Sequence, residues 1–204
     1  MSNQGIRWAH EECKADITMA SGFSKEHLGI EQQIMKASVD GVLVFASASN
    51  YGYMRRISFP ARMKHNVFYI YSTNGTGKIG DESHRINPPD RVGATNFAIF
   101  GEGISLEDQE YELEGSLLTG TSYATSIAAA LAGQLLDFSR QDHPASPIGN
   151  AETLRSFAGM EAVFLQLSRP SLPSIDGYSC IVPFSLIEGC SEVSREVQRK
   201  HVWR

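Results

Sequence analysis

Short apolar runs, each a few residues long, recur along the first half of the chain. The clearest are VLVFASA at residues 42–48, VFYIYS at 67–72 and FAIF at 97–100, and KADITM at 14–19 is a shorter one. An apolar run without polar alternation is typical of a strand that is buried on both faces, as in a parallel sheet covered by helices. We therefore predict a mainly parallel sheet with one strand in each of these four segments.

Helical segments separate some of these runs. Residues 5–13 are predicted to be the end of a helix, and a second helix is predicted where Leu28, Met35 and Val39 fall at helical spacing. Ser24 is a plausible N-cap for it, and Gly41 a natural stop. The resulting order of helix, strand, helix, strand, loop, strand, strand and helix predicts the α/β class.

The last helix of this order is predicted in TGTSYATSIAAALAGQLLDF, residues 119–138. We predict Thr121 as its N-cap and Ser122 as its first residue. Its many alanines make it thin, so other elements can pack closely around it. Two readings are open: a plain core helix, or a helix that presents a serine hydroxyl where backbone N–H groups and the helix dipole stabilise negative charge.

The composition becomes looser after Arg140. A helical segment, ETLRSFAGMEAVFLQL, is predicted with an interruption near Gly159, and prolines at positions 170, 173 and 183 indicate loops beyond it. We therefore predict one unit at residues 1–140 and a C-terminal extension at 141–204 that packs on it and is not an independent domain.

Charge and cysteine content exclude several classes of protein. The net charge of −5 argues against nucleic-acid binding, which needs a basic face. The three cysteines are far apart and form no CxxC pair, so neither a disulfide framework nor a zinc site is expected. No run approaches the length of a membrane span, and the first residues lack the apolar core of a signal peptide. We therefore predict a cytoplasmic protein with no metal or organic cofactor.

The segment around Ser122 resembles the nucleophile motif of the subtilisin-like serine proteases (subtilases), G-T-S-x-A-[ST]-P, with Ser126 in place of the proline. VLVFASASNYG is similar to the strand and Gly-Asn of that family, with Ser49 in place of the glycine and Asn50 as the asparagine. GIRWAHEECKADITMASG is similar to the helix and strand that lead to the substrate cleft. FGEGI at residues 100–104 is a weaker match to the family's A-P-G strand end.

The resemblance implies a subtilisin-like three-layer α/β fold and a serine endopeptidase activity. Ser122 would be the nucleophile, and the Asn50 side chain with the Ser122 backbone N–H would form the oxyanion hole. Ala20, Ser21 and Gly22 would form one wall of the primary specificity pocket. Family members often bind calcium, but the sequence offers no carboxylate cluster for it. The implied substrate is a protein or peptide.

The motifs that would supply the proton-accepting His and its orienting Asp are missing from this sequence. In the family both precede the serine, in H-G-T and D-[ST]-G contexts, and none of the six histidines here has such a context. We therefore expect the C-terminal half of a catalytic domain, with the N-terminal strands missing, and an isolated chain that is inactive. Its first partner would be the missing N-terminal half. Two alternatives remain: a non-catalytic pseudoprotease remnant that serves as a binding module in a larger intracellular protein, and an unrelated α/β binding domain.

Overall fold

A computed structural model covers the chain and describes residues 3–20, 25–52, 57–74, 89, 95–105, 117–141, 149–168 and 177–183. In chain order its elements are α1 (Asn3–Glu11), β1 (Ile17–Ala20), α2 (Leu28–Val39), β2 (Leu43–Ser47), β3 (Phe68–Thr73), β4 (Phe97–Phe100), β5 (Ile104–Ser105), β6 (Leu117–Leu118), α3 (Thr121–Arg140), the 3₁₀ helix η2 (Ala151–Arg155), α4 (Phe157–Ser168) and β7 (Ser179–Cys180). None of the helices in these ranges combines the length and the apolar character that crossing a membrane requires.

Five strands form the main sheet, in the order β1-β2-β3-β4-β7, and every neighbouring pair is parallel. This confirms the predicted α/β class and the mainly parallel sheet. The four predicted strands are all present, each within a few residues of the predicted bounds. Strands β5 and β6 form a separate two-stranded antiparallel ribbon.

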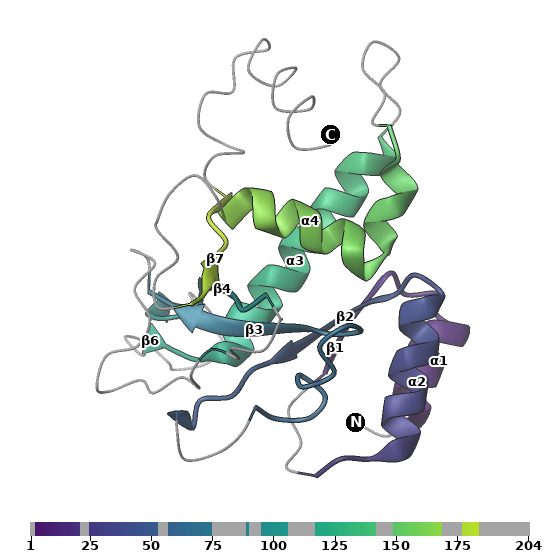
Figure 1. The fold of residues 1–204 in the computed structure, drawn as a ribbon, viewed down its shortest axis with the longest axis horizontal. Helices are drawn as coiled ribbons and strands as arrows, with labels where there is room; N and C mark the ends of the chain where they lie inside the picture. The colour runs from purple at the N-terminus through teal and green to yellow at the C-terminus, as the bar shows by residue number, and fades with distance from the viewer. Residues whose placement is uncertain are drawn as a thin grey trace.

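Helices cover both faces of this sheet, with α1 and α2 on one side and α3 and α4 on the other (Figure 1). Because successive side chains of a strand point to opposite faces, each strand contributes to two cores. Leu43, Phe45, Phe68 and Ile70 pack with α3 and α4. The intervening residues of the same strands pack on the side of α1 and α2: Val44, Ala46, Tyr69 and Tyr71.

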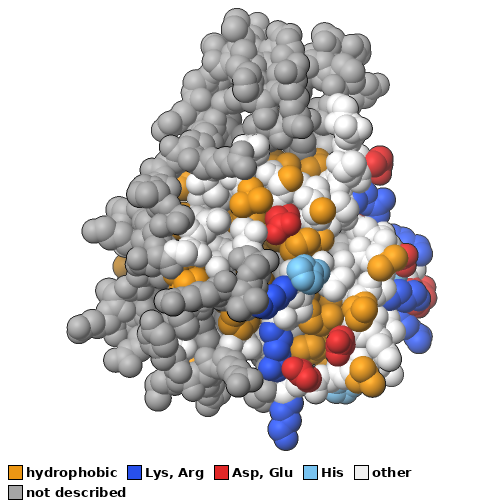
Figure 2. Space-filling model, in the orientation of Figure 1, with side chains coloured by type: hydrophobic (Ala, Val, Ile, Leu, Met, Phe, Trp, Pro, Cys, Tyr) orange, Lys and Arg blue, Asp and Glu red, His pale blue; other side chains and the backbone are white. Residues whose placement is uncertain are grey.

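The helix predicted from the spacing of Leu28, Met35 and Val39 is present as α2, but these three residues do not pack on the sheet. Leu28, Met35 and Val39 are 68%, 48% and 83% exposed, and they form a stripe on the outer side of the helix. The right-hand side of Figure 2, where α1 and α2 lie in Figure 1, shows hydrophobic side chains among charged ones. A second apolar set at helical spacing, Ile30, Ile34 and Ala37, is the buried one.

The predicted start of α2 was also wrong. The helix begins at Leu28, and His27 occupies the N-cap position without a side-chain cap hydrogen bond. Ser24, the predicted N-cap, lies outside the described residues. The predicted role of Gly41 in ending the helix is confirmed. α2 ends at Val39, and Gly41 follows with a φ of 83°, in the left-handed region that favours glycine.

An ion pair connects the segment ahead of β1 with the end of α3. The Asp16 carboxylate accepts two hydrogen bonds from the Arg140 guanidinium, at 2.8 and 2.7 Å, and Arg155 lies 3.6 Å away. The hydrogen bonds from Arg140 are the main cause that lowers the pKa of the Asp16 carboxyl, and both arginine charges add to it. Asp16 therefore has a structural role.

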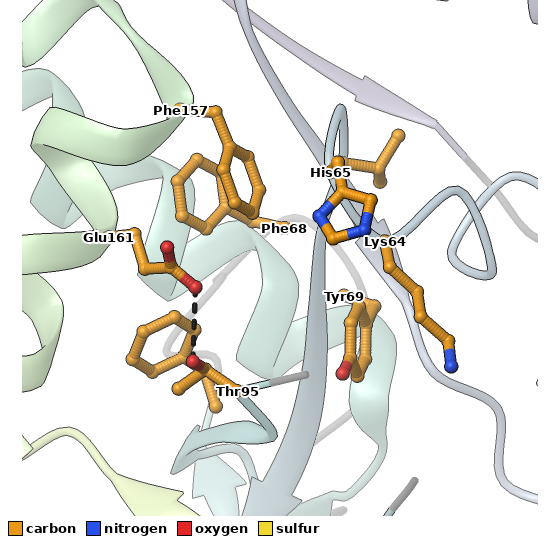
Figure 3. A pocket seen from close by; sticks show the side chains of 9 residues that line it. Lys64, His65, Phe68, Tyr69, Thr95, Phe157 and Glu161 are labelled. Carbon is orange, nitrogen blue, oxygen red and sulfur yellow. Dashed lines mark hydrogen bonds between the residues drawn. The ribbon is translucent and has the colours of Figure 1, made fainter. Parts of the chain in front are cut away.

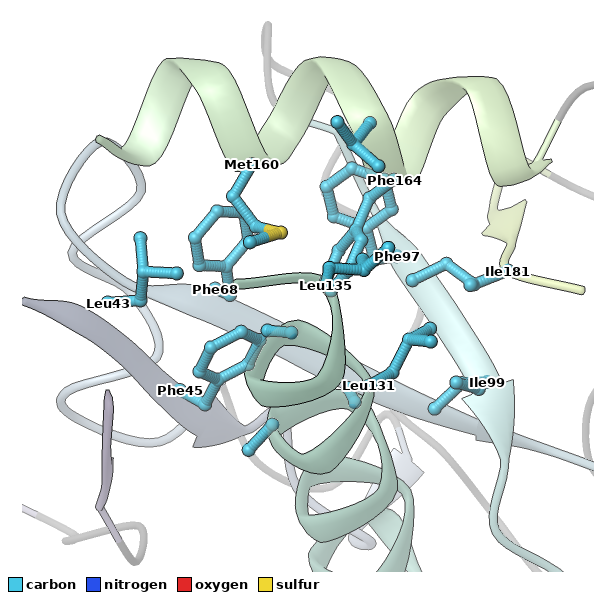
Figure 4. Packing of buried hydrophobic residues seen from close by; sticks show 14 of the residues in the cluster. Leu43, Phe45, Phe68, Phe97, Ile99, Leu131, Leu135, Met160, Phe164 and Ile181 are labelled. Carbon is cyan, nitrogen blue, oxygen red and sulfur yellow. The ribbon is translucent and has the colours of Figure 1, made fainter. Parts of the chain in front are cut away.

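The C-terminal region adds a helix and a strand to the same layers. In Figure 4, α4 lies across α3, and Met160 and Phe164 point from it toward Phe68 and Phe97 of the sheet. Strand β7 pairs with β4 through Ala98 and Cys180. The predicted boundary at residue 140 is not tested by these contacts and stays a prediction.

The interruption in the predicted C-terminal helix falls at Ser156, between η2 and α4, and not at Gly159. Gly159 lies inside α4, where a Cβ would be 2.0 Å from the carbonyl oxygen of Thr153. The glycine is therefore required for the tight corner between η2 and α4.

Gly159→Ala is expected to destabilise the protein by about 1–3 kcal/mol, because the new methyl group overlaps backbone that cannot move away cheaply. Gly133→Ala is the matched control. Gly133 also lies within a helix, but among the described residues its Cβ would contact only Ile17, at 3.7 Å. There the better helix propensity of alanine should stabilise by up to about 1 kcal/mol. Urea denaturation of both variants measures the difference, and equal effects would contradict this account of the corner.

Candidate active site

Ser122 and Asn50 lie side by side at the carboxyl edge of the sheet. Ser122 is the second residue of α3, and Asn50 follows the end of β2. The backbone N–H of Thr121 donates a hydrogen bond of 2.9 Å to Oδ1 of Asn50. Both Ser122 and Asn50 are exposed to solvent. The structure therefore brings together the two residues that the sequence singled out, although they are far apart in the chain.

The start of α3 differs by one residue from the prediction. Gly120 is the N-cap residue and Thr121 is the first helical residue, so Thr121 is not the cap. Gly120 has no capping side chain, and the amide oxygen of Asn50 supplies the cap from another element. A side chain that accepts from a first-turn N–H satisfies one of the groups that a helix leaves unpaired at its start.

This cap fixes the orientation of the Asn50 carboxamide. Its oxygen faces the N–H of Thr121, so its NH₂ group is left as a donor on the other side. Nδ2 lies 3.0 Å from the place where a Cβ on Gly120 would stand. The N–H of Ser122 has no acceptor among the described residues. The predicted oxyanion donors, Nδ2 of Asn50 and the Ser122 N–H, are thus both left without an acceptor in the described part of the chain, and their joint role in stabilising an oxyanion stays a prediction.

Gly101, just after β4, allows α3 to sit this close to the sheet. A Cβ on Gly101 would lie 2.7 Å from both Cβ of Ala124 and Oγ of Ser72. The carbonyl of Gly101 also accepts a 2.9 Å hydrogen bond from Gly120 N–H. In the sequence, Gly101 belongs only to the weakly matching motif FGEGI. A glycine directly after an apolar strand was the signal for a close backbone approach.

Three buried hydroxyls around the head of α3 have no hydrogen-bond partner within the described part of the chain. They belong to Ser49, Ser72 and Thr121. Ser49 also has a φ of 118°, in the region that favours glycine. The residue that replaces the glycine of the family motif is therefore in a strained backbone conformation.

The predicted wall of the specificity pocket is described only in part. Ala20 is buried at the end of β1 and pairs with Ala46 of β2. This places it on the strand next to the one that leads to Asn50. Ser21 and Gly22 lie outside the described residues. The role of all three in binding substrate stays a prediction.

No described histidine forms a hydrogen bond with Ser122. Nε2 of His10 lies 2.9 Å from an oxygen of Asp40, between α1 and α2. His27 precedes α2, and His65 lies in the loop before β3. The three described histidines therefore belong to parts of the fold other than α3 and the end of β2.

A small hollow of about 30 Å³ lies at the opposite, amino edge of the sheet (Figure 3). Its residues are Lys64, His65, Val67, Phe68, Tyr69, Thr95, Phe97, Phe157 and Glu161. Thr95 donates a 3.0 Å hydrogen bond to Glu161 across it. Because β3 and β4 both run away from this hollow, it is separate from Ser122. Within the described ranges, no three His, Cys, Asp or Glu side chains are grouped as metal ligands.

Comparison with known proteins gives one curated relative and several solved structures. The chain is 26% identical over 180 residues to the subtilisin-like protease het-Q2 of Podospora anserina. The PatG macrocyclase in complex with peptide superposes with a TM-score of 0.64 at 21% identity, over 88% of this chain and 51% of that chain. The S218A mutant of the protease domain of PatA has a TM-score of 0.63 at 19% identity, over 97% of this chain and 64% of that chain. No protein-family model matches the chain.

These matches cover most of this chain but only part of each relative. The alignment with the curated relative spans 83% of this chain and 48% of the relative, so the chain spans about half the length of the protein it matches. The solved structures share its parallel sheet with helices on both faces at low identity, which establishes the fold. The chain therefore has the α/β fold of the subtilisin-like proteases, over part of the length of that fold.

Proposed function

We propose that this chain is the C-terminal half of a serine endopeptidase domain of the subtilisin type. The observation that carries the proposal is the hydrogen bond from Thr121 N–H to Oδ1 of Asn50, which brings the exposed Asn50 to the first turn of α3 next to the exposed Ser122. The relationship to a subtilisin-like protease supports it. Helix dipole and N–H donors both favour negative charge at this position.

In the proposed reaction Ser122 attacks the carbonyl carbon of a peptide bond. The carbonyl oxygen becomes an oxyanion, which accepts hydrogen bonds from Nδ2 of Asn50 and from the Ser122 N–H. A serine hydroxyl needs a base that removes its proton. We assign this base and its orienting carboxylate to a segment outside the chain, since no described histidine is positioned for the task.

The missing half has a defined place to dock in this proposal. Strand β1 is at one end of the main sheet, and within the described residues no strand pairs with its outer edge (Figure 1). Met19, at this edge, is 47% exposed. The neighbouring helix α3 leaves Ser126 and Ala130 exposed, so a further element can approach it closely. A parallel strand added to β1 would extend the sheet and place its own carboxyl end beside Ser122.

A fluorophosphonate probe, which labels activated serines, tests the proposal. The isolated chain is expected to remain unlabelled, because its serine lacks a base. The full-length protein is expected to be labelled at Ser122, and Ser122→Ala in that protein should abolish both labelling and proteolysis. Stoichiometric labelling of the isolated chain would refute the need for a missing half. Proteolysis that survives Ser122→Ala would refute the role of the serine.

The second candidate function is a pseudoprotease remnant that binds peptides or partners without cleaving them. The lack of a hydrogen bond between Ser122 and any described histidine favours it. The coding sequence upstream of Met1 separates the two candidates. In-frame D-[ST]-G and H-G-T motifs there would support the endopeptidase, and a full-length protein without them would support the remnant.

A further inference from the structure

Ser49 has a backbone conformation that serine rarely adopts. Its φ is 118°, whereas the other two non-glycine residues with positive φ, Lys14 and Asn150, have values of 52° and 60°. Those two values lie in the ordinary left-handed region, and 118° lies beyond it. A residue in such a conformation is strained and persists only where its surroundings impose it.

Hydrogen bonds to other elements hold both sequence neighbours of Ser49, Ala48 and Asn50. On one side, the N–H of Ala48 donates a 3.0 Å hydrogen bond to the carbonyl of Ile70 in β3. On the other, Oδ1 of Asn50 accepts the 2.9 Å hydrogen bond from Thr121 in α3. Residue 49 therefore spans the short distance between two anchors, one on the sheet and one on the helix.

No interaction of the Ser49 side chain with the described residues offsets the strain of its backbone conformation. It is 6% exposed, and its hydroxyl has no hydrogen-bond partner among the described residues. A buried hydroxyl without a partner is itself unfavourable. Neither side-chain bonding nor solvation therefore explains the conformation, which leaves the two anchors as its cause.

We propose that Ser49 is a positioning residue that makes the Asn50 carboxamide a two-state element. In the engaged state, seen here, the amide oxygen caps α3 at Thr121, the residue before Ser122. In the released state the Asn50–Thr121 hydrogen bond is broken, Ser49 relaxes, and the amide leaves the head of α3. Strain at Ser49 works against the engaged state. The catalytic meaning of this element rests on the proposed function, but its existence does not.

Ser49→Gly in the 204-residue chain tests the proposal, because glycine adopts positive φ without strain. It is expected to raise Tm by about 2–6 °C. In an Asn50→Ala background the anchor is absent and Ser49 is already relaxed, so the same change should give no increase. A double-mutant cycle measures this coupling. An equal Tm increase in both backgrounds would overturn the proposal.

Hydrogen exchange of the Thr121 amide distinguishes the proposed positioning role of Ser49 from a purely structural one. A purely structural role of Ser49 would leave this exchange rate unchanged. Ser49→Gly should slow this exchange at least about fivefold relative to the Ala48 amide, because the engaged state becomes more populated. Ser49→Ala is the matched control. It removes the buried hydroxyl but keeps the Cβ and the strain, so the relative exchange rate of Thr121 should not change. If Ser49→Ala slows it as much as Ser49→Gly, the hydroxyl and not the backbone is responsible and the proposal is wrong.

These measurements need no proteolytic activity. A failed fluorophosphonate experiment would therefore leave the two-state element standing, and unaltered Thr121 exchange would leave the proposed endopeptidase standing.

Discussion

Replacing Asn50 with aspartate in the full-length protein is expected to lower kcat by at least about 10²–10³-fold, the usual cost of losing one oxyanion donor. Folding stability should change little. Aspartate retains an oxygen that can accept the Thr121 N–H, and its negative charge is favourable at the start of α3. It has no N–H to donate, and its charge repels the developing oxyanion. The variant thus separates the capping role of Asn50 from its proposed catalytic role.

Asn50→Ala is the control for the capping role. It removes the acceptor as well as the donor, so a loss of stability of about 0.5–2 kcal/mol should accompany the loss of activity. Thermal unfolding and peptide-hydrolysis kinetics on both variants provide the comparison. An Asn50→Asp protein with near-normal kcat would show that another group holds the oxyanion.

Phe164→Ala is expected to destabilise the chain by about 3–5 kcal/mol, the largest stability effect that we anticipate for a single side chain. The Phe164 ring is fully buried, and its centroid lies 5.5 Å from that of Phe97, 5.6 Å from Phe68 and 6.2 Å from Phe45. These three rings belong to β4, β3 and β2, so one side chain of α4 contacts three strands. Truncation would leave a cavity at the centre of this layer.

Phe157→Ala, at the start of the same helix, is the matched control. Its ring stacks on Phe68 at 4.4 Å but is only half-buried, so solvent can fill the space and the loss should be smaller. Urea denaturation of the 204-residue chain measures both. Should Phe164→Ala cost less than about 1 kcal/mol, α4 would not be an integral part of the core, and residues 141–204 would be separable from the rest.

Strands β2 and β3 were predictable because both of their faces are buried. Serine and threonine occur only at the ends of these strands, so continuous apolar runs reveal them without knowledge of their neighbours. β7 was missed because it is two residues long, Ser179–Cys180, and only its pairing with β4 makes it a strand. The length of an apolar run, and not its composition alone, thus determined which strands could be predicted from the sequence.

The buried face of α2 could not be predicted from helical spacing alone. The helix carries two apolar sets, one with Leu28 and Met35 and one with Ile30 and Ile34, and periodicity fits both. Which set faces the sheet depends on where α1 packs, and that is a tertiary property. Ion pairs such as Lys36 with Glu11 cross between the two helices on a third side of α2.

The sequence motifs predicted that Ser122 and Asn50 belong to one site. They did not predict the contacts that hold the two residues in place. The capping of α3 by Asn50, the clash that a side chain on Gly101 would cause and the backbone angle of Ser49 all depend on distances between separate elements. The φ of 118° shows that Ser49, which replaces the glycine of the family motif, has a backbone conformation that favours glycine. The assignment of Ser122 as nucleophile stays a prediction until the serine is tested.

Because the strands divide their side chains between two cores, the two layers of helices pack on different residues of the same strands. Only the layer with α3 carries Ser122, whereas α1 and α2 contact the other set of strand residues. Sequence drift in the outer pair of helices would therefore reduce the population of folded molecules and leave the chemistry of each folded molecule intact. Natural variation in this protein should accumulate under α1 and α2 well before it reaches the head of α3.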